Sequence, residues 1–466
     1  MNARGKSVAA PSRTRAAEAG AIQRCIDSGC GREHGIGERV YMCAGCGAPL
    51  EIFVREAVSG DGAALQKTWE GRRGSLDPRD RSGVWRFREL LPFGSDAPIV
   101  TLSEGNTPLY DAPRSAAYCK LDALRLKHQG CNPTGSFKDT GMTAAVTQAL
   151  ALNARTVVCA STGNTAASLA AYAARAGLQS AILLPHGQIT SSKLAQSIDY
   201  GAAVREIDGN FDDCMRLIQE LGDDPSVYVA NSINPFRIEG QKTVAFELME
   251  QRAWRVPDHV VVPGGNLGNS SALGKGFSEL LALGLIERLP KLSVIQAEGA
   301  APLAHLFARL GSDESRKKGG VPERIETVAN PKTLATAIKI GSPVSWKKAL
   351  RAILESGGSV IAVSEQEIAD AKAMIGRDGI GCEPASATTV AGIRKLVAAG
   401  RIAASEDVVA VLTGHMLKDP DYVNAYHRGT LAAEAGGKPI HGAFRNQPVR
   451  VAATKSAILE SLKGAE

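Results

Sequence analysis

The chain has 466 residues, with 54 Lys and Arg against 48 Asp and Glu for a formal charge of +6, and 44% of its positions are hydrophobic. This composition is that of a globular protein long enough for two or three domains, and it excludes intrinsic disorder, collagen and coiled coil. Only 5% of positions are aromatic while glycine occurs 49 times, which favours an α/β protein over an aromatic-rich β-sandwich.

Residues 1–20 form a basic segment. It contains four basic residues and no acid before Glu18, the basic residues being Arg4, Lys6, Arg13 and Arg15. That balance is also typical of an import sequence, but no amphipathic period is visible. We therefore predict a disordered basic start.

Residues 21–55 form a small cysteine module with Cys25-x4-Cys30-x12-Cys43-x2-Cys46 spacing. Nine cysteines are an odd number in a chain without a signal peptide, which favours a reducing, cytoplasmic compartment and a metal site over disulfides. Paired cysteines at this spacing predict a zinc ribbon with four thiolate ligands. The alternative is an eroded module that holds no metal. Residues 20–50 have one aromatic residue and no Lys, so we expect a structural clip or assembly element and no nucleic-acid binding.

A polar connector, residues 56–81, leads into a body in which apolar runs alternate with helical patterns. This alternation predicts βαβ units and parallel-rich sheets covered on both faces. We expect a large domain over 82–150 and 246–440, a smaller nested domain over 151–245, and a C-terminal tail over 441–466. The predicted strands are Thr156–Ala160, Ser180–Leu184, Ala203–Ile207, Val227–Val229, His259–Val262, Ser293–Gln296, Ser359–Val363 and Asp407–Val411.

One apolar stretch is long enough in principle to cross a bilayer. Residues 156–174 lack Asp, Glu, Lys and Arg. Their centre is polar, however, with Ser161, Thr162, Gly163, Asn164 and Thr165 in succession. We therefore expect no membrane association.

A Pro/Gly turn, Asn132-Pro-Thr-Gly-Ser-Phe-Lys138, delivers a lysine to the start of a helical pattern. The positive end of a helix disfavours an ammonium, so the pKa of Lys138 should fall toward the neutral, nucleophilic amine that imine formation requires. The alternative is a solvated surface lysine.

Three further strand ends carry polar loops. The run Pro263-Gly-Gly-Asn-Leu-Gly-Asn269 before a helix is either a phosphate cradle or a structural turn. Ser161-Thr-Gly-Asn-Thr165 either caps a helix or grips a carboxylate, and Thr413 places a hydroxyl after the strand Asp407–Val411. A lysine, a phosphate cradle and polar loops at strand ends together indicate pyridoxal phosphate held covalently.

The sequence resembles threonine synthases, in the tryptophan-synthase-β-like (fold type II) class of pyridoxal-phosphate enzymes. The resemblance covers roughly residues 83 to 420, and a cysteine-rich module often precedes the catalytic body in this class. The matching blocks are Glu104–Pro108, Asn132–Asp139, Ser161–Thr165, Asn231–Arg237 with Glu239–Gln241, Gly265–Asn269, Glu383–Ser386 and Leu412–His415. One departure is Thr140, where many relatives have Arg.

The resemblance implies a role for each motif residue. Lys138 would bind the cofactor covalently, Asn164 would bind the ring 3-oxygen, and Thr413 would face the ring nitrogen. The cofactor phosphate would be bound by Gly265, Asn266, Leu267, Gly268 and Asn269. The substrate carboxylate would be bound by Ser161, Thr162 and Thr165, and the substrate phosphate by Asn231, Ser232, Arg237 and Lys127.

The family's reaction converts O-phospho-L-homoserine and water to L-threonine and phosphate, with Lys138 as the base and the smaller domain closing over the substrate. Two enzyme alternatives are cysteate synthase, which shares most of these motifs, and a threonine or serine dehydratase of the same fold type. An alternative of another class is a zinc-ribbon binding or regulatory protein whose catalytic body has decayed. The resemblance further implies that the protein is a homodimer. It also implies that the substrate is a small phosphorylated amino acid.

Overall fold

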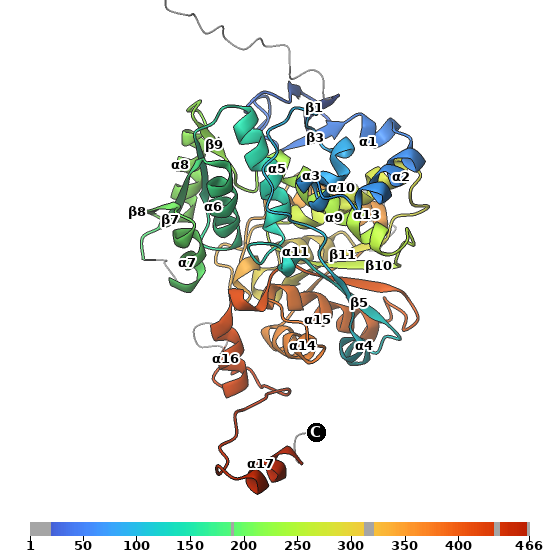
Figure 1. Ribbon diagram of the computed structural model, residues 1–466, viewed down its shortest axis with the longest axis vertical. Coiled ribbons are helices and arrows are strands. Elements are labelled where there is room, and N and C mark those ends of the chain that lie inside the picture. Colours follow the sequence, from blue (N-terminus) through green and yellow to red (C-terminus); the bar gives the residue numbers. More distant parts are fainter. Residues whose placement is uncertain (1–19, 188–190, 312–320, 433–438, 464–466) are drawn as a thin grey trace, which may run out of the picture.

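The computed structural model describes residues 20–187, 191–311, 321–432 and 439–463. The predicted basic start lies outside the described residues except for Gly20. The chain forms three sheets, in which a small antiparallel sheet sits beside two larger sheets flanked by helices (Figure 1).

The cysteine module is the antiparallel sheet, with strand order β2-β1-β3. Its strands are β1 (Ala21–Cys25), β2 (Glu33–Gly35) and β3 (Leu50–Val54). The polar connector that follows is mostly helical. Its helices are α1 (Glu56–Ser59), α2 (Gly62–Arg72) and α3 (Pro78–Arg81), followed by the 3-10 helix η2 (Trp85–Leu90).

The large sheet has strand order β12-β11-β10-β13-β5-β4, and only the β4–β5 pair is antiparallel. Its strands are β4 (Leu109–Asp111), β5 (Leu124–His128), β10 (His259–Pro263), β11 (Lys291–Ala297), β12 (Val360–Val363) and β13 (Val408–Leu412). Both faces are buried, because Val260 and Val262 pack in one apolar cluster and Val261 packs in another. This explains the uninterrupted apolar runs of the central strands β10 and β13.

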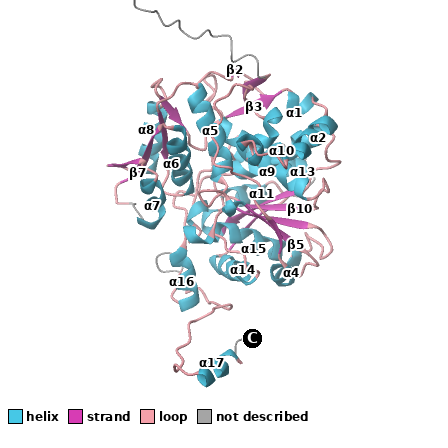
Figure 2. Cartoon of the chain, viewed as in Figure 1, coloured by secondary structure: helices cyan, strands magenta, loops and turns pink. Residues whose placement is uncertain are grey.

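Helices cover both faces of the large sheet (Figure 2). The first cluster contains side chains from α9 (Pro235–Gln251), α10 (Gly268–Ala282), α11 (Pro302–Arg309) and α13 (Trp346–Ser356). The second contains side chains from α4 (Pro113–Cys119), α14 (Glu365–Arg377) and α15 (Pro384–Ala398).

The third sheet is wholly parallel, with order β8-β7-β6-β9. Its strands are β6 (Thr156–Ala160), β7 (Gln179–Pro185), β8 (Ala203–Ile207) and β9 (Val227–Val229). Side chains from α5 (Lys138–Ala151), α6 (Asn164–Ala176) and α7 (Ser191–Asp199) pack on one face, and those from α8 (Phe211–Leu221) on the other.

All eight predicted strands are present, with ends that differ by no more than two residues. The domain boundaries remain a proposal, which the sheets support because every strand of the third sheet lies within 151–245. The boundary at 245/246 falls inside α9, a continuous buried helix, so we propose that the nested unit ends before Pro235.

The predicted C-terminal tail is partly helical. After α16 (Pro420–Arg428), the chain leaves the body and ends in α17 (Lys455–Leu462), which stands apart from the sheets (Figure 1). Of the described residues, none belongs to a helix with the length and apolar character needed to span a bilayer.

Candidate active site

The predicted loops meet where the strands end. The lysine loop, residues 132–138, runs beside the loop that follows β13, because Phe137 N donates a hydrogen bond of 2.9 Å to Thr413 O. An isolated β-bridge joins Ser136 to Gly414 in the same place. The ends of β5 and β13 therefore place Lys138 and Thr413 together.

Glu383 joins the two larger sheets at this point. Asn164 Nδ2, at the start of α6, donates to one carboxylate oxygen at 2.9 Å, and Thr413 Oγ1 donates to the other at 3.0 Å. Glu383 is 1% exposed, and burial raises the pKa of its carboxyl above the ordinary value. The motifs gave this residue no role, although it lies in a matching block, because its partners are 219 and 30 positions away.

Lys138 is the first residue of α5 and is half-buried. Burial, followed by repulsion from Arg237, lowers the pKa of its amine to about 7, and the attraction of Glu383 opposes this shift. The amine lies 4.4 Å from the ring centre of Phe137, and it makes no hydrogen bond within the described part of the chain. Its pKa falls as predicted, but the physical causes are burial and a neighbouring cation.

Arg237, in the first turn of α9, is a buried cation. Its Nη1 donates to Ala230 O at 3.2 Å, its Nε has no partner, and no carboxylate among the described residues pairs with it. Burial lowers the pKa of the guanidinium to about 10. A buried, unpaired guanidinium is costly unless an anion joins it. The position of Arg237 is therefore suited to an anionic ligand.

The packing of α5 against α9 places Arg237 near Lys138. A Cβ atom on Gly240 would lie 1.9 Å from Thr140 O, so the two helix backbones touch there. Any side chain at residue 240 would separate the helices and move Arg237 away from the lysine.

The glycine-rich run after β10 has the features of an anion cradle. Leu267 has φ of +63° and precedes α10, whose first turn has no side chain capping it. Both polar side-chain atoms of the buried Asn269 lack partners. Asn266 points elsewhere, because its Oδ1 accepts from Val344 N at 2.7 Å. Free N–H groups at a helix start and an unsatisfied amide together suit a phosphate.

Comparison with known proteins gives the family. The family described as "Pyridoxal-phosphate dependent enzyme" matches residues 100–414. Threonine synthase from Methanocaldococcus jannaschii is 46% identical over 401 residues, which cover 86% of this chain and 93% of the relative. The chain belongs to the threonine synthase family. Threonine synthase from Mycobacterium tuberculosis is 47% identical over 337 residues, covering 72% of this chain and 88% of the relative.

Solved structures of other proteins share the fold of this member of the threonine synthase family. Threonine deaminase isoform 2 from Solanum lycopersicum has a TM-score of 0.55 at 20% identity, covering 66% of this chain and 79% of that one. Diaminopropionate ammonia lyase from Escherichia coli has a TM-score of 0.56 at 15% identity, covering 78% and 91%. At these identities the likeness shows the shared α/β fold of type II, as predicted.

The site residues of this threonine synthase family member fit pyridoxal phosphate. The cofactor has a phosphate, an aldehyde and a polar ring. The uncapped start of α10 with Asn269 suits the phosphate, and the amine of Lys138 suits the aldehyde. Asn164 and Thr413 bond to the two carboxylate oxygens of Glu383, and their polar groups suit the polar ring of the cofactor.

The predicted substrate-binding residues fall into two groups. Ser161, Thr162 and Thr165 surround the start of α6, where Ser161 Oγ accepts from Gly163 N at 3.2 Å. Asn231 instead holds the end of β6, since its side chain exchanges hydrogen bonds of 3.0 and 3.2 Å with the backbone of Ala160. Asn231 therefore positions the loop that begins at Ser161, and Ser232 follows it half-buried.

Lys127 does not belong with the substrate-binding residues. It lies on β5 with no exposed surface, and its ammonium donates to Glu247, to Thr107 O at 2.6 Å and to Gln251 Oε1 at 2.9 Å. These three acceptors satisfy all of its donors, so none remains for a phosphate. The assignment of Lys127 was wrong, because its acidic partner is 120 positions away in sequence.

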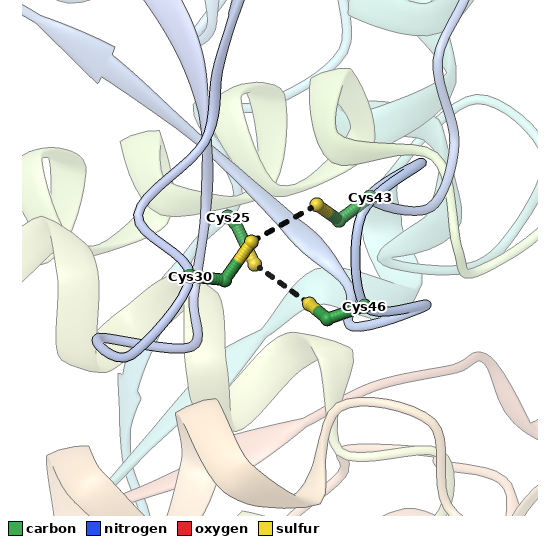
Figure 3. Close-up of side chains that lie close together, drawn as sticks. All are labelled: Cys25, Cys30, Cys43 and Cys46. Atoms are coloured by element: carbon green, nitrogen blue, oxygen red, sulfur yellow. Dashed lines mark hydrogen bonds between the residues drawn. The ribbon is translucent and has the colours of Figure 1, made fainter.

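The four predicted metal ligands converge outside this site. The sulfur atoms of Cys25, Cys30, Cys43 and Cys46 all lie within 4.8 Å of one another (Figure 3). Two of the contacts are 3.4 Å, between Cys25 and Cys46, and 3.6 Å, between Cys30 and Cys43. Four sulfurs around one zinc at about 2.3 Å would be separated by a similar distance, so the cluster fits a tetrahedral zinc ion.

Proposed function

We propose that this chain catalyses the conversion of O-phospho-L-homoserine and water to L-threonine and inorganic phosphate. The observation that carries the proposal is the buried, unpaired guanidinium of Arg237 beside the low-pKa amine of Lys138. A phosphorylated amino acid would supply the missing anion at Arg237. The identity to threonine synthases over most of the chain supports the same substrate.

The cofactor would be held by the residues already described. Lys138 Nζ would bind it covalently, Asn164 would meet the ring oxygen, and Thr413 would face the ring nitrogen. Its phosphate would lie on the backbone N–H groups of residues 265–269. Pyridoxal phosphate, when bound, supplies a conjugated ring that withdraws electrons from the substrate's α-carbon.

Lys138 Nζ would move the protons of the reaction. An amine with a pKa of about 7 is substantially neutral at neutral pH, so it can take a proton from the substrate's carbon and return it. Arg237 would hold the γ-phosphate in place while it leaves, since its planar fork matches phosphate oxygens. Ser161, Thr162 and Thr165, with the start of α6, would orient the substrate carboxylate.

Incubation with O-phospho-L-homoserine tests the proposal. We expect threonine and phosphate to appear in equal amounts, because one phosphate leaves for each water added. Parallel incubations with O-phosphoserine plus sulfite, and with threonine or serine, test the cysteate synthase and dehydratase alternatives. Turnover in either parallel assay with none on O-phosphohomoserine would contradict the proposal. Absence of bound cofactor and of every activity would favour the decayed binding protein.

We also propose that the cysteine cluster holds structural zinc and that the module clips the two larger sheets together. Tyr41 Oη accepts from Val229 N of β9 at 2.8 Å, and Lys348 Nζ of α13 donates to Leu50 O at 3.2 Å. The module therefore bonds to a strand of the third sheet and to a helix that covers the large sheet, and a metal that fixes its loops would stabilise both contacts.

Replacing Cys46 with Ser should remove this zinc. We expect about one zinc per chain in the parent protein and close to none in the variant, with the melting temperature lowered by roughly 5 °C because the clip loosens. Elemental analysis and thermal unfolding measure the two effects. Cys131→Ser is the matched control, since Cys131 is exposed and lies outside the cluster. Equal zinc in both variants would contradict the site.

The resemblance further supports a cytoplasmic homodimer, which we retain as a proposal. The substrate would be a small molecule, with no part for nucleic acid.

A further inference from the structure

The loop after β13 places a second lysine against the lysine loop. Lys418 ends the 3-10 helix η6 (Met416–Lys418), and its side chain runs along Gly135, where a Cβ atom would lie 3.0 Å from Lys418 Cε. The two loops are also joined by His415 N, which donates to Gly135 O at 2.9 Å. Lys418 therefore lies against the segment that carries Lys138.

Gln196 of α7 bonds to both loops at once. Its Oε1 accepts from Lys418 Nζ at 2.5 Å, and its Nε2 donates to Thr134 O at 3.2 Å. The same helix is anchored on the third sheet, because Leu194, two residues before Gln196, is buried in the apolar cluster of that sheet. One side chain of the nested unit thus holds two loops that belong to the large sheet.

Acidic side chains lie near the half-buried ammonium of Lys418. Burial lowers the pKa of this ammonium, and the negative charges of Asp139, Glu383 and Asp419 oppose the shift. Asp139 is itself fixed, because its carboxylate accepts from Thr134 N at 2.7 Å and from Ser168 Oγ of α6 at 2.6 Å. The contact between Lys418 and Gln196 therefore lies among groups that already connect α6 with the lysine loop.

We propose that Lys418 and Gln196 form a latch that holds α7 against the lysine loop and keeps the nested unit closed against the segment that carries Lys138 during turnover. Both are positioning residues, since Lys418 acts through Gln196 and neither is assigned to the reacting atoms. The purpose of the latch rests on the proposed function, because a closed site would exclude water until the substrate's phosphate has left.

Hydrogen exchange of the α7 amides tests the latch without relying on turnover. Lys418→Met should speed exchange over Ser191–Asp199 about tenfold in the cofactor-loaded enzyme, because a charge-assisted hydrogen bond no longer opposes local opening. Lys418→Arg retains a donor and should restore slow exchange. Lys67→Met removes an exposed lysine from α2 and should leave exchange unchanged. Unchanged exchange in Lys418→Met would overturn the proposal.

A second measurement separates the latch from a general loss of stability. Gln196→Leu should resemble Lys418→Met, and the double variant should exchange no faster than either single variant, because both remove the same contact. Additive effects would overturn the proposal. In steady-state assays, each variant should raise KM for O-phosphohomoserine more than it lowers kcat. An enzyme that lacks this activity but shows the coupled exchange would refute the proposed function and leave the latch standing.

Discussion

Replacing Lys138 with Ala is expected to lower the rate of threonine formation by at least about 10⁴-fold, since the one amine serves both to hold the cofactor and to move protons. The side chain is half-buried and makes no hydrogen bond to any described residue, so the variant should fold normally. Lys138→Arg retains the positive charge but cannot lose a proton at working pH, and it should be equally inactive. Phosphate release and the colour of the bound cofactor measure both variants. Retention of a tenth of the activity by either variant would exclude Lys138 from the reaction.

The same amine predicts how cofactor uptake depends on pH. Only the neutral amine attacks an aldehyde, and the pKa of Lys138 is about 7. The rate at which the cofactor-free protein takes up the cofactor should therefore rise about tenfold per pH unit below pH 7 and level off above it. A lysine with an ordinary pKa would keep accelerating to about pH 10. Because Arg237 contributes to the lowered pKa, removing its charge should move the inflection to higher pH.

The parts of the site that lie in local motifs could be predicted from the sequence. Parallel strands gather their carboxyl-end loops at one edge of a sheet, so Thr413 and the run at 265–269 could be assigned to the ends of predicted strands. Lys138 could be assigned from its Pro/Gly turn and the helical pattern that follows it. Strands such as β10 and β13 were predictable because both of their faces are buried and their apolar runs are continuous. β5 was missed because it carries Arg125 and Lys127 within a five-residue strand.

The remaining features depend on pairs that are far apart in sequence. Lys127 has a side chain that could bind a phosphate, and its structural role is visible only in its contact with Glu247. Glu383 and Asn164 meet across 219 positions, and Lys418 and Gln196 across 222. The periodicity of apolar residues in the sequence does not reveal such a contact, because the packing of the nested unit against the large sheet creates it. The cause of the low pKa of Lys138 is likewise tertiary.

Replacing Arg237 with Met is expected to raise KM for O-phosphohomoserine by about 100-fold or more, since each charge-assisted hydrogen bond to a phosphate contributes about 1.5–3 kcal/mol and the guanidinium can make two. Arg237→Lys retains the charge but loses the planar fork, so an intermediate loss of roughly tenfold is expected. Cofactor affinity should change little, because we propose that the cofactor phosphate binds at the start of α10 rather than at Arg237. Equal losses of substrate and cofactor would remove Arg237 from the substrate site.

The unpaired state of Arg237 makes a second, opposite prediction for the same variant. A buried cation without an acid destabilises the free protein, whereas Met fills a similar volume without a charge. Arg237→Met should therefore melt a few degrees higher than the parent in the absence of substrate. Added inorganic phosphate should stabilise the parent, because an anion that binds only the folded state raises its stability, and should leave the variant unchanged. A lower melting temperature for Arg237→Met would mean that the guanidinium is needed for folding, and the role in binding the substrate phosphate would then lose its structural support.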